Sequence, residues 1–176
     1  MPQPPRRPFR QGSGHNPGPP RSDRNTSADR GWDPVAEWYD KLVGESGSDY
    51  HKNVILPAAL RLLAAKPGES VIDVCCGQGV LARPLIEAGI GKFTGVDASP
   101  RLIDAAKARH GKDPRVSFIV ADACKPGAWT DASHDAATCI MAVHDVPDAT
   151  ALFANISRAL KPGGWLLFEH GYDQGE

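Results

Sequence analysis

The chain has 176 residues, enough for one domain of ordinary size. Its formal net charge is -1, so the overall charge indicates no particular partner, and 41% hydrophobic with 23% charged residues is typical of a globular protein. No apolar run approaches the roughly 20 residues that span a bilayer, so we expect no membrane segment.

Residues 1–31 differ from the rest in composition. The first 30 residues contain six arginines and two aspartates, many Pro, Gly and Ser residues, and almost no aliphatic side chains. Such a segment cannot bury enough apolar surface to offset its ordering entropy, so we expect a disordered tail before one domain over 32–176. It lacks the apolar core of a secretory signal, and its prolines argue against a transit peptide. A weak electrostatic contact with nucleic acid or acidic lipid stays open.

The four cysteines contain no CxxC pair and do not match zinc-ligand spacing; they are Cys75, Cys76, Cys124 and Cys139. We therefore expect no metal site. Reduced thiols are typical of a cytoplasmic protein, which is the location we expect.

Two helical patterns come first along the chain. Apolar residues from Val35 to Leu42 fall on one helical face, and Gly44 ends that pattern. Residues 50–65 predict a second helix, with Pro57 near its start or kinking it. We expect a helical cap over 32–66, ahead of a core over 67–176.

From Ser70 onward short apolar strands alternate with helices. Strands are predicted at 71–75, 92–96, 116–120, 136–143 and 165–168, and helices at 80–88, 100–110 and 148–160. Ser99 and Pro100 are a good helix start, and 161–164 is expected to form a loop. The alternation predicts an open α/β sandwich of three layers with a mostly parallel, Rossmann-like sheet. Ligands then bind at the carboxyl ends of the strands.

The first predicted strand runs into a glycine turn. Gly77, Gly79 and Ala82 fit the G-x-G-x-x-G/A dinucleotide pattern weakly. Asp73 separates two ligand classes, because its carboxylate would repel the pyrophosphate of a nicotinamide cofactor but attract the cationic sulfonium and ammonium of S-adenosylmethionine. The alternative is that Asp73 only hydrogen-bonds amides of the turn.

Carboxylates also follow the second and third predicted strands. Asp97 lies 20 residues after Gly77, the usual separation for an acid that hydrogen-bonds ribose hydroxyls. Its alternative role is to cap the helix that begins at Ser99. Asp122 is placed to accept a hydrogen bond from an adenine amino group.

The motifs VIDVCCGQG, GVDAS, ADA and ALKPGGWLLFEH, in this order, resemble those of the class I methyltransferases of the type 11, small-molecule group, over about 32–171. The resemblance implies S-adenosylmethionine as cofactor, S-adenosylhomocysteine as product and strand order 3-2-1-4-5. It implies that the turn at 75–79 packs on the methionyl part, that Asp97 holds the ribose with Ala98 beside it, and that Asp122 faces adenine with Ala123. Tyr39 either helps to cover the cofactor or packs in the core.

The sequence departs from that family in two places. The family usually has glycine where Cys75 stands, and a side chain there would narrow the site or shift the backbone. The family fold also continues past the fifth strand into an antiparallel hairpin, for which too few residues remain. The open edge of the fifth strand implies a shortened chain, a reduced domain, or a second subunit or other partner that covers it.

Catalytic residues are harder to predict, because methyl transfer needs mainly positioning and a dry site. His144, after the fourth strand, is the candidate base, with Asp145 able to orient it; the alternative is a packing role. Tyr50 and His51 are expected near the substrate from their position alone. The scattered tryptophans argue against a nucleic-acid substrate.

Three functions therefore stand. The first is a methyltransferase acting on a small molecule. The second is a non-catalytic module that binds S-adenosylmethionine, and the third, disfavoured by Asp73, is a nicotinamide-dependent oxidoreductase.

Overall fold

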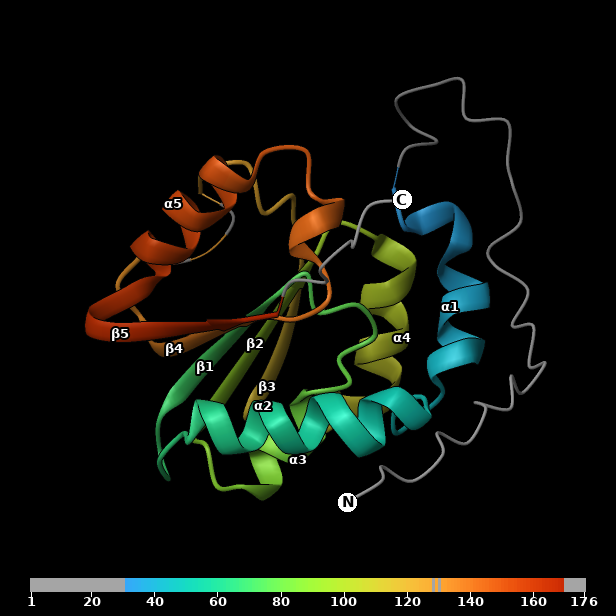
Figure 1. The fold of residues 1–176 in the computed structure, drawn as a ribbon, viewed down its shortest axis with the longest axis horizontal. Coiled ribbons are helices and arrows are strands. Elements are labelled where there is room, and N and C mark those ends of the chain that lie inside the picture. Colours follow the sequence, from blue (N-terminus) through green and yellow to red (C-terminus); the bar gives the residue numbers. More distant parts are fainter. Residues whose placement is uncertain (1–30, 128, 130, 170–176) are drawn as a thin grey trace, which may run out of the picture.

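The computed structural model describes residues 31–127, 129 and 131–169. Apart from Gly31, the predicted tail over 1–31 lies outside these residues. The described residues form one five-stranded sheet with helices on both faces (Figure 1). The strands are β1 Ser70–Val74, β2 Lys92–Asp97, β3 Val116–Val120, β4 His134–Cys139 and β5 Leu160–Phe168.

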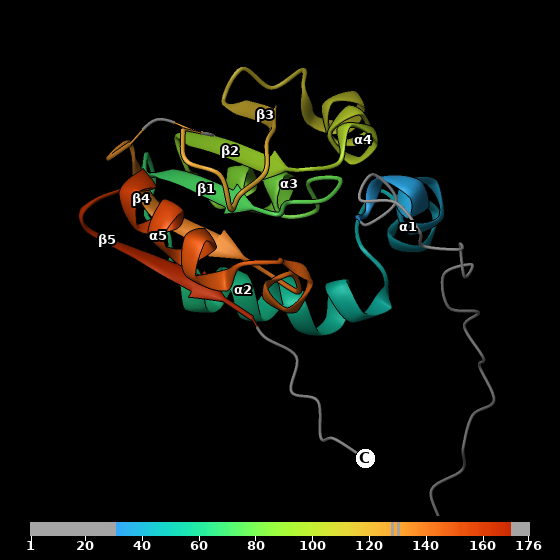
Figure 2. The same cartoon turned by 90° about the horizontal axis from the view of Figure 1, so that it is seen from above.

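Every strand pair is parallel, and the strand order is β3-β2-β1-β4-β5. This confirms the predicted fold class and order. The order reverses beside β1, because the chain moves outward from β1 to β2 and β3 and then crosses back to β4. The carboxyl ends of β1, β2 and β4 therefore meet at one rim, next to α1 (Figure 2).

Within the described residues, five α-helices lie around the sheet. They are α1 Ala36–Val43, α2 Leu56–Leu63, α3 Ala82–Glu87, α4 Pro100–His110 and α5 Ala149–Ala159. Short helical segments precede α1 at Asp33–Val35, precede α2 at His51–Ile55 and follow β4 at Val143–Asp145. None of the helices in the described residues is long and apolar enough to cross a membrane.

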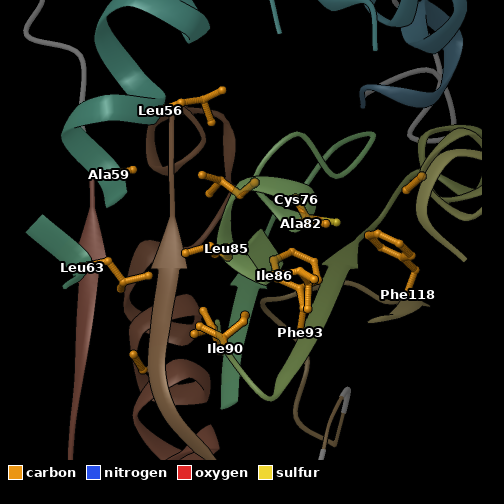
Figure 3. Close-up of a cluster of buried hydrophobic side chains, with 14 of the residues drawn as sticks. Leu56, Ala59, Leu63, Cys76, Ala82, Leu85, Ile86, Ile90, Phe93 and Phe118 are labelled. Atoms are coloured by element: carbon orange, nitrogen blue, oxygen red, sulfur yellow. The ribbon is translucent and has the colours of Figure 1, made fainter. Parts of the chain in front are cut away.

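Each face of the sheet has its own apolar core. One core joins α2, α3 and α4 to the sheet around Phe93 and Phe118, whose rings meet edge to face at 5.9 Å (Figure 3). The other core packs α5 on the opposite face through Leu152 and Ile156. The central strand β1 is buried throughout, as expected for a strand covered by helices on both faces of the sheet.

Two predicted strand boundaries differ from the structure by four or more residues. The fourth strand ends at Cys139 rather than at residue 143, because the chain leaves the sheet at Ile140 and Met141 adopts a positive φ of 57°. The fifth strand begins at Leu160, so the predicted loop over 161–164 lies within its bounds. A register shift opposite His134 and Ala136 accommodates these extra residues.

The predicted second helix is real, but its first turn is π-helical. The π turn covers His51–Ile55 and the α-helix starts at Leu56, with Pro57 in its first turn. Proline lacks the N–H that would bond to the preceding turn, so a change of helix type at this point is expected. The start of α4 matches its prediction, because the Ser99 hydroxyl accepts a hydrogen bond from the Leu102 amide at 3.2 Å.

An ion pair and a hydrogen bond connect the helical cap to the core. Arg109 of α4 makes a bidentate pair with Asp40 of α1, at 2.6 and 2.9 Å. The Ser99 hydroxyl donates to Asp33 at 2.6 Å. Asp33 and Asp40 flank Tyr39 in the sequence, so these contacts fix the position of Tyr39.

Replacement of Arg109 by lysine is expected to lower the free energy of unfolding by about 1 kcal/mol, because lysine cannot form the planar two-bond pair with Asp40. Hydrogen exchange should quicken in α1. Arg83→Lys is the matched control, since Arg83 forms an exposed pair with Glu87 and should give no measurable change. Equal effects of the two substitutions in urea denaturation would contradict this role for Arg109.

Gly95, in the middle of β2, is required by close packing. A Cβ atom at this position would lie 2.6 Å from Phe118 Cδ1 and 2.9 Å from Cys76 Sγ. Gly95→Ala should therefore destabilise the fold by about 1–3 kcal/mol through overpacking. Gly31→Ala, which has nothing within 4 Å, is the control; unchanged urea midpoints for both variants would contradict the prediction.

Candidate functional site

A cavity of about 480 Å³ opens at the carboxyl ends of the strands. Its walls come from the turns after β1, β2 and β3, from the segment after β4, and from the helical cap. This volume lies in the range that small-molecule and cofactor sites occupy, about 300–1,000 Å³. Most of the predicted site residues line it: Tyr39, Asp73, Cys75, Gly77, Asp97, Ala98, Asp122, Ala123 and His144.

Asp73 provides a buried carboxyl group in the wall of the cavity. Its exposed fraction is 3%, and the Thr138 hydroxyl donates a hydrogen bond to Asp73 Oδ1 at 2.7 Å. Burial raises the pKa of Asp73 to about 7, and the Asp97 carboxylate adds to this rise, although the Thr138 bond opposes it. The predicted alternative, bonding to amides of the turn, is not what the structure shows, because the partner is a hydroxyl on β4.

Asp97 joins two turns at the rim of the sheet. Its carboxylate accepts hydrogen bonds from the Gly77 amide and from the Ser99 amide, both at 2.9 Å. Burial raises the pKa of Asp97, while these amide bonds oppose the rise. The cap of α4 is Ser99 rather than Asp97, so the alternative helix-capping role of Asp97 is not what the structure shows. Each carboxylate oxygen of Asp97 retains a lone pair for a ligand hydroxyl, as the predicted ribose role requires.

Asp122 and Ala123 line the cavity beyond β3. The Asp122 carboxylate accepts a hydrogen bond from the Cys124 amide at 2.9 Å and lies 3.5 Å from Lys125 Nζ. The buried Asn155 side chain of α5 donates to the Ala123 carbonyl at 2.7 Å and to the Lys125 carbonyl at 3.1 Å. The helix α5, on the face of the sheet opposite α2, α3 and α4, therefore holds the turn after β3 in place.

Cys75 keeps a backbone conformation that favours glycine. Its φ is +60°, and its thiol hydrogen-bonds to Cys139, which together with burial raises the pKa of the Cys75 thiol. A left-handed conformation costs a residue with a Cβ about 1–2 kcal/mol. All four cysteines carry free thiols.

Comparison with known proteins shows the family to which the chain belongs. A sequence profile described as a methyltransferase domain matches residues 72–168, which is more than half of the chain. The chain belongs to the class I S-adenosylmethionine-dependent methyltransferase family.

One curated relative of this methyltransferase chain is a ubiquinone biosynthesis O-methyltransferase of Thiobacillus denitrificans. It is 32% identical over 151 residues, which cover 80% of this chain and 57% of the relative. The chain spans about half the length of the curated relatives it matches.

Solved methyltransferase structures share the fold. A methyltransferase in a complex with the Haloferax volcanii Trm112 activator superposes with a TM-score of 0.64 at 28% identity, covering 76% of this chain and 56% of that one. A Haemonchus contortus phosphoethanolamine N-methyltransferase, solved with phosphomonomethylethanolamine and S-adenosylhomocysteine, gives a TM-score of 0.62 at 29% identity and covers 77% of this chain and 32% of that one.

The residues of this methyltransferase cavity fit S-adenosylmethionine. Asp73 offers a buried carboxyl group whose ionised form a cationic ligand would stabilise, and Gly77 leaves the turn open, since a Cβ there would meet only Tyr39, at 3.6 Å. Tyr39 packs edge to face against Trp32, with ring centroids 4.9 Å apart. Burial, and then the Asp97 carboxylate, raise the pKa of Tyr39. Tyr39 thus both packs in the cap and lines the cavity.

Two predicted residues occupy less central places. Gly79 does not line the cavity: a Cβ on it would lie 2.9 Å from the Phe118 ring, so close packing explains this glycine. His144 stands at the edge of the cavity with 46% of its side-chain surface exposed, and its Nε2 atom lies 3.5 Å from Asp145 Oδ2. No group of three or more His, Cys, Asp or Glu side chains that could hold a metal occurs within 31–127, 129 and 131–169.

The sequence prediction missed several cavity residues. Gln78 stands at the variable position between two glycines, and Leu102 and Met141 carry no chemical signal in the sequence. His51 was expected near the substrate from position alone, and the structure places it in the cavity wall.

Proposed function

We propose that this chain binds S-adenosylmethionine and transfers its methyl group to a small-molecule acceptor. The observation that carries the proposal is Asp73, a buried carboxyl group beside the cavity whose only hydrogen-bond partner in the described part of the chain is Thr138. A cationic ligand would stabilise the ionised form that burial disfavours. The proposed ribose and adenine contacts are Asp97 and Asp122.

The proposed mechanism depends on positioning. The bound cofactor supplies a methyl group already activated on a sulfonium sulfur. The loops at Gly77 and Asp97 hold one end of the cavity in a fixed geometry through their mutual hydrogen bond, and Tyr39 reduces access of water from the cap side. His144 remains a predicted base at the cavity edge.

Isothermal titration calorimetry with S-adenosylmethionine, S-adenosylhomocysteine and NAD tests the cofactor assignment. We expect both sulfur ligands to bind and NAD not to bind; the reverse result would overturn the proposal in favour of an oxidoreductase. A methyl-release assay then separates the two remaining functions. Binding without transfer to any acceptor would support a non-catalytic module.

The chemistry of the relatives suggests the acceptor class. The Thiobacillus relative is an O-methyltransferase of ubiquinone biosynthesis, so an aromatic hydroxyl compound is our first choice. We propose no nucleic-acid substrate, and the free thiols support a cytoplasmic location.

A partner at the sheet edge is also proposed. Among the described residues β5 pairs only with β4, and Trp165 and Phe168 of β5 are exposed. An open strand edge with apolar side chains favours pairing with a further strand, from a second subunit or another protein. Sedimentation of the purified chain tests for the second subunit, which a strictly monomeric protein would exclude.

A further inference from the structure

Two residues at the rim of the cavity have a left-handed backbone conformation that side chains disfavour. Cys75 follows β1 with a φ of 60°, and Met141 follows β4 with a φ of 57°; both line the cavity. Among the described residues, the other non-glycine residues with a positive φ are Ala64 and Ala132, which precede β1 and β4 and do not line this cavity. A left-handed residue with a long side chain is rare and persists only where its surroundings hold it, often at functional sites.

The Glu169 side chain holds Met141 in this conformation. The Met141 amide donates a hydrogen bond to Glu169 Oε2 at 3.0 Å, and a carboxylate is a strong acceptor for a backbone amide. The Glu169 amide donates to the Cys139 carbonyl at 3.1 Å, which continues the pairing of β5 with β4 beyond Phe168. Glu169 is therefore fixed to β4 by its backbone, while its side chain binds the residue at which the chain leaves the sheet. Glu169 does not itself line the cavity, so it acts through Met141.

The strand order shows which side of the cavity Met141 shapes. The proposed nucleoside contacts, Asp97 and Asp122, follow β2 and β3, and Asp73, which would attract the cationic end of the cofactor, lies on β1. In the order β3-β2-β1-β4, the segment after β4 is thus on the side of the cationic end away from the nucleoside. Three successive residues of that segment line the cavity: Ile140, Met141 and Ala142. This segment therefore borders the transferred methyl group and the acceptor.

We propose that Glu169 is a positioning residue for methyl transfer: its carboxylate keeps Met141 in the left-handed conformation, and Met141 forms the wall of the cavity beside the transferred methyl group. The inference rests on the proposed function. Without this hydrogen bond the chain after β4 relaxes toward a negative φ, and Met141 leaves the wall. The acceptor is then misplaced relative to the sulfonium methyl group, and a displacement of about 1 Å at a reacting centre can slow a reaction about 10²-fold.

The composition of the chain provides a reporter for this wall. The sequence contains two methionines, Met1 and Met141, so NMR of the chain labelled with ¹³C in its methionine methyl groups gives one signal from the cavity. Met141→Leu identifies that signal by removing it. S-adenosylhomocysteine should shift the Met141 signal of the unaltered chain, because the sulfur of the bound ligand lies beside this wall in the proposal.

Substitutions of Glu169 test the hydrogen bond itself. Glu169→Ala should shift and broaden the Met141 signal of the ligand-free chain, because nothing then holds the left-handed conformation. Glu169→Gln should keep the signal of the unaltered chain, since the oxygen of a side-chain amide accepts the same bond. Glu45→Ala is the control: Glu45 is an exposed glutamate after α1, and its loss should leave the signal unchanged. The affinity for S-adenosylhomocysteine in calorimetry should be unchanged in all three variants, because none of these residues contacts the proposed cofactor ligands.

Turnover separates a positioning role from a purely structural one. With catechol, a simple aromatic hydroxyl compound, as the acceptor probe, Glu169→Ala should lower kcat/KM for the acceptor by about 10- to 100-fold. The KM for S-adenosylmethionine should stay unchanged. Glu169→Gln should recover most of the activity, and Glu45→Ala should keep all of it.

The outcomes separate this inference from the proposed function. If the unaltered chain binds neither sulfur ligand, the proposed function fails, and the role in methyl transfer fails with it. If the chain binds S-adenosylmethionine but does not methylate catechol, the NMR results decide.

Three results would overturn the inference while the proposed function stands. The first is a Met141 signal that Glu169→Ala leaves unchanged, or that Glu169→Gln alters as much as Glu169→Ala does. The second is bound S-adenosylhomocysteine that leaves the Met141 signal of the unaltered chain unmoved. The third is a large loss of affinity for S-adenosylhomocysteine in Glu169→Ala, which would assign Glu169 to the cofactor side of the cavity or to the fold.

Discussion

Asp73→Asn is expected to stabilise the ligand-free protein above pH 7 and to remove most of its affinity for S-adenosylmethionine. Burial raises the pKa of Asp73 from 3.8 to about 7 in the folded chain. Between these two values the folded state holds a proton that the unfolded state has lost. The stability contributed by this group is therefore complete below pH 4 and is lost as the pH rises toward 7.

The size of this effect is on the order of 4 kcal/mol, from 1.36 kcal/mol for each pH unit between the two pKa values. Calorimetric melting from pH 4 to 8 should show the unaltered chain losing stability where Asp73→Asn does not. Thr138→Val is the companion variant: the Thr138 hydroxyl bond opposes the rise, so its removal should push the Asp73 transition to higher pH. Identical melting profiles for the Asn variant and the unaltered chain would contradict the buried-charge interpretation.

A cation bound in the cavity opposes the effect of burial on Asp73, because it favours the ionised carboxylate over the protonated form. Binding of S-adenosylmethionine to the unaltered chain should release protons below pH 7 and tighten as the pH rises toward 7. Titrations in buffers with different ionisation enthalpies measure this release. Asp73→Asn should abolish both the proton release and this pH dependence.

Asp97→Ala is expected to weaken cofactor binding by about 1–3 kcal/mol, or roughly 5- to 150-fold, through lost hydrogen bonds. The carboxylate of Asp97 contributes twice: it is the proposed ribose ligand, and it holds the Gly77 and Ser99 amides in place. Its loss should therefore lower the melting temperature as well. The affinity and the melting temperature of Asp97→Asn should lie between those of the unaltered chain and those of Asp97→Ala, since a side-chain amide offers one accepting oxygen instead of two.

Asp104→Ala is the matched control for Asp97, because Asp104 is an exposed aspartate of α4. It should leave both affinity and melting temperature unchanged. Unchanged affinity for S-adenosylmethionine in Asp97→Ala itself would reject the ribose assignment.

Alternation of apolar strands and helices was sufficient to predict the layers of the fold. The strand over 116–120 and the helix start at Ser99 were predicted correctly, because both depend on local signals, hydrophobic runs and side-chain capping. The end of β4 was not predictable in this way. Ile140 and Met141 continue the apolar run of the strand, but they line the cavity, and the Glu169 carboxylate accepts the Met141 amide hydrogen bond at 3.0 Å.

The candidate site also contains some residues that the sequence could predict and others that it could not. Carboxylates after strands were predicted because parallel topology brings strand ends together, as Asp73, Asp97 and Asp122 illustrate. Gln78 was harder to recognise, because its interest lies in what it lacks: a hydrogen-bond partner for its buried Nε2 atom. Spacing along a sequence carries no information about unfilled hydrogen bonds.

The amide of Asn155 links the turn at Ala123 to α5, on the side of the sheet away from the other helices. A nucleoside held at Asp122 would therefore damp motion not only in its own turn but in a helix it never touches. Binding of a nucleoside in the cavity and the rigidity of α5 are then thermodynamically coupled. A substitution that loosens α5 should therefore weaken nucleoside binding without altering any contact to the ligand.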